Sequence, residues 1–502
     1  MFENQPKGLY ALALANTGER FGYYTMLAVF ALFLRANYGL TAGTAGIIYS
    51  SFLMFVYFFP LFGGMLADKF GFGRMVTTGI IIMFLGYLLL AVPLGGDTFA
   101  LTVMLVALVS IGFGTGLFKG NLQVMVGDLY NDPQYADKRD SGFSIFYMAI
   151  NIGALFAPTA AIRIMEWAQQ QGVSENDSYH FAFAVACASL ILSIAIYYLF
   201  RSTFRHVEGG TKKAGTQAEA DTLSAAETKE RLVALLLVFG VVAFFWMSFH
   251  QNGLSLTYFA NEFTEQSAEG VKAMAFNVWN LVAIIIMVYA AFSVFQSKTA
   301  KARILSAIVI LAGVAFLAYN YGVLDGSVEV KAPIFQQFNP FYVVALTPVS
   351  LGIFGWLAAR GREPKAPRKI AYGMIVAAVA FCVMLYASLS LPSPNEQAAL
   401  GAAAPRVSSY WLISTYLVLT FGELLLSPMG ISFVSKVAPP KYKGACMGGW
   451  FVSTAIGNQL VMVGGILWGD LPLWSVWAVF AGLCILAALF MFAIMKRLEK
   501  VC

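Results

Sequence analysis

The stretch ANTGERFGYY, residues 15–24, places two opposite charges inside an apolar run. LYALAL precedes it and TMLAVFALFL follows it, so residues 9–34 are long enough to cross a bilayer as one helix. Glu19 and Arg20 stand side by side within this run. Charged groups in a membrane span are rare, and they pair with one another or face a polar path. The stretch therefore predicts a membrane helix with one functional face.

The composition of the whole chain indicates a polytopic membrane protein. Of its 502 residues, 59% are hydrophobic and 12% are charged, which is far from the usage of soluble domains. The net charge of +6 comes from basic residues scattered over short loops, and this pattern does not predict nucleic-acid binding. Cys187, Cys382, Cys446 and Cys484 lie in apolar runs and Cys502 ends the chain, so we expect no disulfide. We also expect no cleaved signal, because residues 1–10 lead directly into a full-length span.

Fourteen stretches are apolar and long enough to cross the membrane, for which a helix needs ~20 residues. They lie near 9–34, 43–67, 75–93, 99–127, 142–167, 180–200, 232–260, 270–296, 303–322, 340–359, 370–391, 409–435, 445–468 and 474–496. With both termini in the cytoplasm, basic loops such as DKFGFGR, QSKTAKAR and RGREPKAPRK fall on the cytoplasmic side. Acidic or neutral loops such as LGGDT and LPSPNEQ fall outside, as the positive-inside rule requires.

The longest polar stretch divides the chain into two parts. Residues 203–230 are rich in Ala, Gly, Thr and charges, and we interpret them as a flexible cytoplasmic linker. The spans before and after it predict an N-terminal bundle, residues 1–202, and a C-terminal bundle, residues 231–502. Two linked bundles are typical of transporters whose halves move against each other.

Ionisable residues away from the span ends are few: Glu19, Arg20, Lys119, His250 and Glu423. Their presence on four spans in both halves predicts a central polar cavity rather than isolated ion pairs. Helical spacing places one broad set on a common face of the first span: Asn16, Glu19, Arg20, Tyr23, Tyr24 and Leu27. We expect this face to line the cavity.

Two of the charged residues have informative neighbours. Lys119 lies in GFGTGLFKGN, whose glycines predict close packing between helices. Glu423 opens GELLLSPMG, in which Pro428 weakens the helix beside Ser427, so that a kink there could serve gating. Hydrogen-bonding groups and aromatic walls are expected from Tyr57, Tyr147, Asn151, Trp246 and Asn339, although each of these alone fits ordinary packing.

Two other classes of protein fit an integral membrane chain. A membrane enzyme could use Glu423 and His250 as acid and base, but the chain has neither HExxH nor Gly-x-Ser-x-Gly, and only three histidines. We therefore predict no enzymatic activity, no metal site and no cofactor. A peptide sensor would carry a soluble output domain, and the longest polar stretch is only the linker at 203–230.

Several motifs then stand in the order of a known family. GERFGYY (18–24), GGMLADKFGFGR (63–74), GLFKGN (116–121), FSIFYMAINIG (143–153), FNP (338–340) and GELLLSPMGISF (422–433) follow one another along the chain. With these motifs the chain resembles the proton-dependent oligopeptide transporters of the major facilitator superfamily. The resemblance implies an all-α fold of two six-helix bundles plus two additional helices, fourteen in total, that works by alternating access. The additional pair falls near 270–296 and 303–322, whereas relatives usually carry theirs between the halves.

The resemblance also implies a substrate and roles for residues. The substrates would be di- and tripeptides carried with protons, and a short peptide needs one anionic and one cationic pole in its site. Glu423, helped by Asn151 and Asn339, would receive the ammonium, and Arg20 and Lys119 would receive the carboxylate. The remaining substrate-binding residues would be Tyr23, Tyr24, Tyr57, Tyr147, Trp246, Ser427 and Trp450. Proton coupling would use Glu19, Lys119, His250 and Glu423, and gating would involve Asp68, Arg74 and Pro428.

The chain departs from the family pattern in its first span. The family carries a glutamate where this chain has Asn16 and an arginine where it has Leu27, so both members of a charge pair are missing together. In the seventh span, His250 stands where relatives often carry an acidic residue. Two alternatives therefore stay open, a carrier of another small solute (a drug-like amine, nitrate or a carboxylate) and an uncoupled peptide facilitator. We expect a monomer in the lipid bilayer of a bacterial inner membrane, with both termini in the cytoplasm and no nucleic-acid partner.

Overall fold

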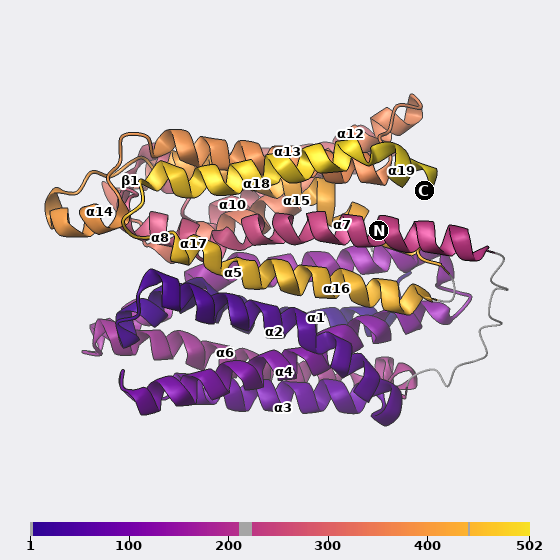
Figure 1. The fold of residues 1–502 in the computed structure, drawn as a ribbon, viewed down its shortest axis with the longest axis horizontal. Coiled ribbons are helices and arrows are strands. Elements are labelled where there is room, and N and C mark those ends of the chain that lie inside the picture. The colour runs from indigo at the N-terminus through magenta and orange to yellow at the C-terminus, as the bar shows by residue number, and fades with distance from the viewer. Residues whose placement is uncertain (1–3, 210–222, 440–441, 502) are drawn as a thin grey trace.

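The computed structural model describes residues 4–209, 223–439 and 442–501. The central part of the predicted linker, residues 210–222, lies outside the described residues. The long helices run side by side along one direction, and the chain begins and ends at the same end of the molecule (Figure 1). We call this the terminal end and the opposite one the far end.

The first half of the chain forms six long helices. They are α1 (Lys7–Tyr38), α2 (Ala42–Phe70), α3 (Phe72–Ala91), α4 (Thr98–Asp128), α5 (Arg139–Gln170) and α6 (Glu175–Leu199). Short 3-10 turns follow α4 and α6: η1 (Leu129–Asn131), η2 (Ala136–Lys138), η3 (Arg201–Thr203) and η4 (Arg205–Val207).

Glycines set the packing of this half. A Cβ added at Gly114 of α4 would lie 2.6 Å from the carbonyl oxygen of Gly79 in α3, so the two backbones touch. The close helix contact expected from GFGTGLFKGN is present at this crossing.

The second half contains the remaining elements. Its helices are α7 (Ala225–Phe249), α8 (Ser255–Glu262), α9 (Gly270–Met274), α10 (Val278–Gln296), α11 (Ala300–Gly322), α12 (Phe338–Ala359), α13 (Ala366–Ala387), α14 (Pro394–Leu400), α15 (Tyr410–Val437), α16 (Lys443–Leu460), α17 (Met462–Ile466), α18 (Leu473–Ala493) and α19 (Met495–Lys500). Its 3-10 turns are η5 (His250–Gly253), η6 (Ala332–Gln337) and η7 (Gly401–Ala403). Strands β1 (Ser267–Glu269) and β2 (Ser327–Glu329) pair antiparallel.

The additional pair of helices is α10 and α11, which form a hairpin between α8 and α12. The first of them begins at Val278 rather than near residue 270, because Gly270–Met274 forms the separate short helix α9 and Asn277 caps α10 through its side chain. Two other predicted spans are interrupted. The seventh breaks at η5, where a side chain on Gly253 would collide with the Tyr49 hydroxyl, and another breaks between α16 and α17.

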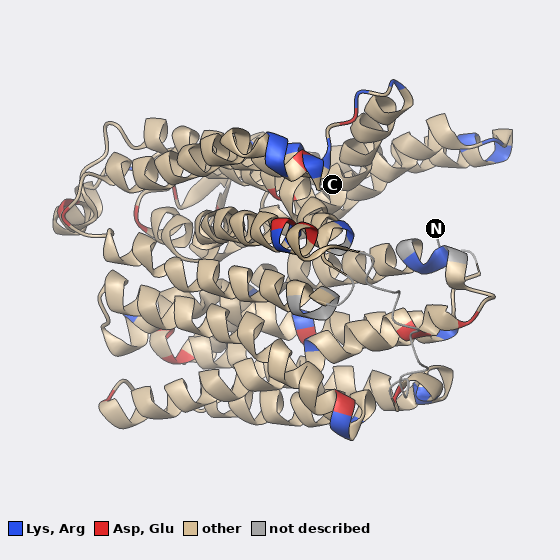
Figure 2. Cartoon of the chain, turned by 45° about the vertical axis from the view of Figure 1, so that its right-hand side comes forward, with Lys and Arg blue, Asp and Glu red and all other residues tan. Residues whose placement is uncertain are grey.

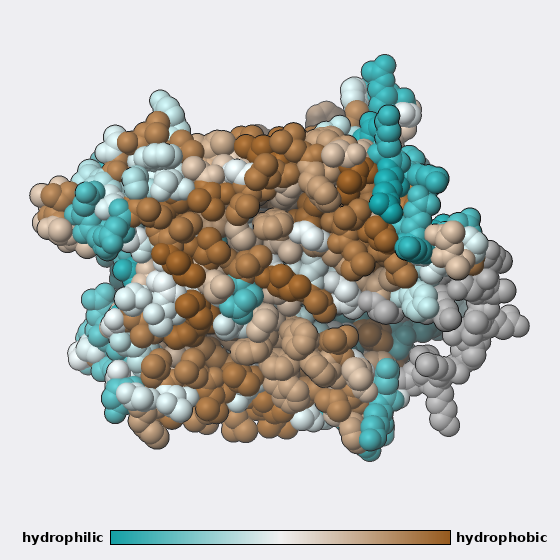
Figure 3. Space-filling model, viewed as in Figure 1, coloured by the Kyte–Doolittle hydropathy of each residue, from teal (hydrophilic) through white to brown (hydrophobic). Residues whose placement is uncertain are grey.

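The molecule has the surface of a membrane protein. Among the described residues, 12 helical stretches are long and apolar enough to cross a bilayer, and α1 and α16 run parallel to them within the bundle to complete the expected fourteen (Figure 1). Lys, Arg, Asp and Glu gather at the helix ends (Figure 2). A broad apolar belt separates the two polar ends of the face shown in Figure 3.

Candidate functional site

The two charges of α1 form an ion pair with each other. Arg20 Nη2 donates to Glu19 Oε1 at 2.6 Å, and Arg20 Nε donates to Glu19 Oε2. The two side chains are only 1% and 3% exposed, and the guanidinium lies 4.4 Å from the centre of the Tyr23 ring. Neighbouring opposite charges in a low dielectric compensate each other, which explains why both stand in this span. In this conformation the donors of Arg20 are therefore directed to Glu19.

Lys119 of α4 is the half-buried member of the charged group in the first half, whereas Glu19 and Arg20 are buried. Its Nζ lies 4.1 Å from the centre of the Tyr57 ring of α2, a cation–π contact. It interacts electrostatically with Arg20 and Glu19, but no salt bridge joins it to any carboxylate of the described residues. Its charge is therefore available to a ligand anion.

Glu423 provides the opposite charge in the second half. This side chain of α15 is 8% exposed, and its Oε2 accepts a hydrogen bond of 2.9 Å from Asn339 of α12. Asn339 also donates to Thr420 at 3.1 Å, which fixes the direction of its amide. No cation forms a salt bridge with Glu423 within the described ranges.

Tyrosines connect the two poles. Tyr57, whose ring carries the Lys119 contact, interacts electrostatically with Glu423 across the two halves, and so do Tyr24 and Tyr147. Tyr147 is nevertheless 47% exposed. Its ring is therefore partly uncovered, although one of its electrostatic partners belongs to the other half.

His250 stands in the break of the seventh span and lies near the same cluster. Its Nδ1 is 2.6 Å from Oδ1 of Asn458 in α16, and its ring stacks on Trp246 at 5.2 Å and lies 6.4 Å from the ring of Tyr57. The Trp246 indole nitrogen is buried without a hydrogen-bond partner. It is thus a free donor beside the histidine.

The other predicted residues are placed less centrally or are engaged elsewhere. Asn151 donates to the carbonyl of Tyr147 in its own helix at 3.0 Å. Trp450 is buried against α15, where a side chain on Gly430 would meet its ring. Ser427 is half-buried and Pro428 exposed within the continuous helix α15. Asp68 and Arg74 are exposed near the α2–α3 turn at the terminal end. The roles assigned to these residues stay predictions.

Sequence reasoning missed Asn458. It is fully buried, it faces His250, and its Nδ2 donates to the carbonyl of Leu53 in α2 at 3.3 Å, so it joins the two halves. The side chain of Asn458 is a neutral amide, so it is not among the ionisable residues that indicate a functional site. The signal that was present is its position in STAIGNQL, where Asn458 and Gln459 interrupt an otherwise weakly polar span.

The two halves are fastened toward the far end. Arg35 of α1 forms a salt bridge of 2.5 Å with Glu262 of α8, and the Trp468 indole donates to the same carboxylate at 2.9 Å. Gln459 donates to Ser50 at 3.2 Å and to Ser51 at 3.3 Å in α2. We call Arg35, Glu262 and Trp468 the far-end latch.

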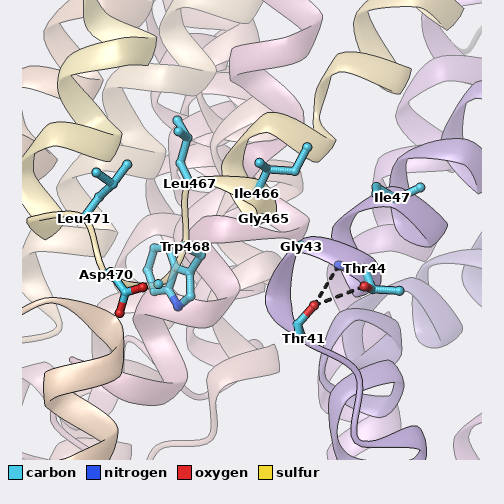
Figure 4. Close-up of a pocket in the computed structure, with 11 residues that line it drawn as sticks. Thr41, Gly43, Thr44, Ile47, Gly465, Ile466, Leu467, Trp468, Asp470 and Leu471 are labelled. Carbon is cyan, nitrogen blue, oxygen red and sulfur yellow. Dashed lines mark hydrogen bonds between the residues drawn. The ribbon is translucent and has the colours of Figure 1, made fainter.

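A cavity beside the latch is separate from the cluster of charged residues. It has a volume of about 520 Å³ and lies on the seam between the halves, with Thr41–Ile47 on one side and Gly465–Leu471 on the other (Figure 4). Asp470 is the one ionisable residue in its lining. None of the predicted substrate-binding residues contributes to it, so we place the candidate site at the Lys119–Glu423 cluster.

Comparisons with known proteins concern the chain as a whole. The chain is 28% identical over 484 residues to the uncharacterized transporter YclF of Bacillus subtilis, covering 91% of this chain and 87% of that one. It is 28% identical over 498 residues to the peptide transporter YePEPT of Yersinia enterocolitica, covering 93% and 89%. A crystal structure of a peptide transporter POT in complex with sulfate shares the fold, with a TM-score of 0.74 at 23% identity over 100% of this chain and 96% of that one.

The family match covers most of both halves. Residues 73–226 and 315–464 match the sequence model of the POT family, and the unmatched interval between them contains α10 and the first part of α11. Members of this family are membrane transporters, so the chain is a transporter and not an enzyme. The chain belongs to the POT family.

Proposed function

We propose that the protein is a proton-coupled symporter that imports di- and tripeptides by alternating access. The observation that carries the proposal is a pair of opposite charges without salt-bridge partners among the described residues, Lys119 in the first half and Glu423 in the second, which both interact with Tyr57. A peptide zwitterion offers a carboxylate to the lysine and an ammonium to the glutamate. On binding, Lys119 and Glu423 would each exchange hydrating water for a group of opposite charge. The peptide-transporter names of the relatives support the same substrate class.

The position of the polar contacts supports a direction of opening. The latch joins the halves at the far end, whereas Tyr147, on the other side of the cluster from the latch in this proposal, is 47% exposed. With the termini in the cytoplasm of a bacterial inner membrane, as the basic loops favour, this is the state that is open to the cytoplasm. Each protomer contains a complete set of poles, so a monomer would suffice for transport.

Proton coupling would use groups that change partner when the substrate arrives. A peptide carboxylate at Lys119 would weaken the pull of that lysine on Glu19, and a proton on Glu423 or His250 would change the bond to Asn339 or Asn458. Substrate and proton would then bias the same two-state equilibrium, as symport requires.

The experiment is uptake of a labelled dipeptide into proteoliposomes under an imposed pH gradient. We expect Lys119→Ala and Glu423→Ala each to abolish accumulation above equilibrium, because each removes one pole. Lys7→Ala and Glu329→Ala remove the same charges from exposed positions and should transport like the parent. Accumulation by either site variant at parental levels contradicts the two-pole site.

A second candidate is an uncoupled carrier, or a carrier of another small solute. The observation that favours it is the Glu19–Arg20 pair, which leaves Lys119 as the cation that faces the ligand, together with Asn16 and Leu27 in place of charges. Equilibration of the dipeptide that ignores the gradient identifies a facilitator. Absence of dipeptide entry, with entry of a monocarboxylate or amine instead, identifies the other solute.

A further inference from the structure

A crevice lies between the additional hairpin and α12, on the side of the bundle that faces lipid. It has a volume of about 430 Å³ and is lined by Tyr289, Phe292, Ser293, Gln296, Ser297, Pro348, Leu351 and Gly352. Leu351 is 68% exposed and the nearby Phe295 is 84% exposed. The last residues of α10 and of α12 lie at the terminal end of the molecule. The crevice therefore lies toward that end of the apolar belt (Figure 1).

The bottom of the crevice is polar. Ser306 of α11 donates to Ser293 Oγ at 2.9 Å, and the hydroxyls of Ser293 and Ser297 are 3.1 Å apart. Gln296 is exposed, and its amide makes no hydrogen bond with another described residue. Polar groups that face lipid without a complete set of partners favour a ligand with hydrogen-bonding atoms.

The rim of the crevice is basic. Lys298, Lys301 and Arg303 lie in and after the turn that joins α10 to α11, and Arg303 Nε donates to the carbonyl of Ser297 at 2.9 Å, which holds the guanidinium at the opening. Arg360, whose guanidinium lies 3.8 Å from the centre of the Trp356 ring, follows the end of α12 beyond the crevice and adds positive charge at the same end of the molecule. No salt bridge joins any of these four cations to a carboxylate in the described parts of the chain. Figure 2 shows such basic residues at the terminal ends of the helices.

We propose that this crevice binds one anionic phospholipid of the leaflet at the terminal end. The headgroup phosphate would lie between the basic rim and the Ser293–Ser297 hydroxyls, and the acyl chains would follow Phe292 and Leu351. Basic pockets between membrane helices at the cytoplasmic side suit such headgroups by charge and by position. Pro348 in the crevice and Asn339 at Glu423 belong to the same helix, so the lipid contacts the helix that positions one pole of the candidate site.

The test is native mass spectrometry of the full-length protein released from vesicles of phosphatidylcholine with about 20 mol% phosphatidylglycerol, so that an anionic and a zwitterionic phospholipid compete for the crevice. We expect the parent to retain one phosphatidylglycerol in preference to phosphatidylcholine. In Lys298→Gln/Arg303→Gln, retention should fall roughly tenfold, because each basic residue near the surface contributes to anionic-lipid binding. Gly352→Leu should reduce it as well without changing any charge, since a Cβ at Gly352 already lies 3.3 Å from Phe292.

The matched control is Lys496→Gln/Arg497→Gln, which removes two exposed charges at the same end of the molecule but on α19. It should retain the lipid like the parent. Equal loss in this control would show a general surface-charge effect and overturn the proposal. Retention without preference for the anionic lipid, or a stable dimer mass in place of bound lipid, would overturn it too. If Gly352→Leu fails to elute as a folded species, the two charge variants decide the outcome.

Discussion

At the scale of single residues, the sequence predicts which groups matter better than it predicts how they pair. Ionisable side chains in an apolar chain are few, so Lys119, His250 and Glu423 stand out without a structure. Their partners depend on rotamers and on neighbouring helices. Glu19 could have paired with Lys119, but the structure pairs it with the adjacent Arg20. Asn458, which bonds His250, carries no charge and gives no comparable signal.

The Glu19–Arg20 pair leads to a stability prediction. Arg20→Met should lower the free energy of unfolding by about 3 kcal/mol or more, because it leaves the Glu19 carboxylate buried without its partner. Glu19→Gln/Arg20→Met removes both charges and should regain most of that loss. Thermal unfolding of the purified variants in one detergent measures the difference. A double variant as unstable as the single one would mean that the packing of the arginine stem, rather than charge compensation, stabilises this part of α1.

At the scale of elements, hydropathy located the spans because the membrane fixes their length and polarity. The 32 residues of α1 include the predicted 9–34, and α10 and α11 lie where an additional pair was expected. Helix interruptions and short strands are harder to predict from the sequence. At the break at η5, Gly253 lies against Tyr49 of another helix, and the pairing of β1 with β2 joins segments on either side of the hairpin. Contacts between distant segments leave no periodicity in the sequence.

The crossing of α3 and α4 gives a prediction at this scale. Gly114→Ala should destabilise the protein by about 2 kcal/mol, because overpacking a close contact typically has an effect of this size and the new Cβ would lie 2.6 Å from the Gly79 carbonyl oxygen. Gly64→Ala is the matched control, since no heavy atom lies within 4 Å of a Cβ at that helical position. Alanine there should be neutral or slightly stabilising through its higher helix propensity. Melting temperatures of both variants check the contrast, and equal values would refute the assigned crossing.

At the scale of the whole molecule, the sequence supplies two halves but not the state in which they stand. The linker composition and the charge bias of the loops predict the division and the orientation. The state depends on weak contacts between the halves, such as the bonds of Gln459 to Ser50 and Ser51. The alignment of these three side chains exists only once both halves are folded. In alternating access such contacts form and break in each cycle, so they must be weak. Weak contacts between uncharged side chains give no strong pattern in the sequence.

The far-end latch gives a prediction about this equilibrium. Glu262 accepts from both Arg35 and Trp468, so Glu262→Gln should weaken the closure of the far end and increase the population that opens there. Ala42, 5% exposed at the seam where its carbonyl accepts from Tyr258, is a suitable reporter when it is replaced by cysteine in a background without the native cysteines. Loss of a half-buried ion pair changes this equilibrium by on the order of 1 kcal/mol, so labelling of Ala42→Cys by a membrane-impermeant maleimide should become about fivefold faster.

Glu499→Gln is the control, because it breaks the ion pair with Arg368 inside the second half, at the terminal end. It should leave the labelling rate unchanged. The latch has no role in closure if Glu262→Gln labels at the parental rate, and the reporter fails to measure the far end if Glu499→Gln accelerates labelling equally.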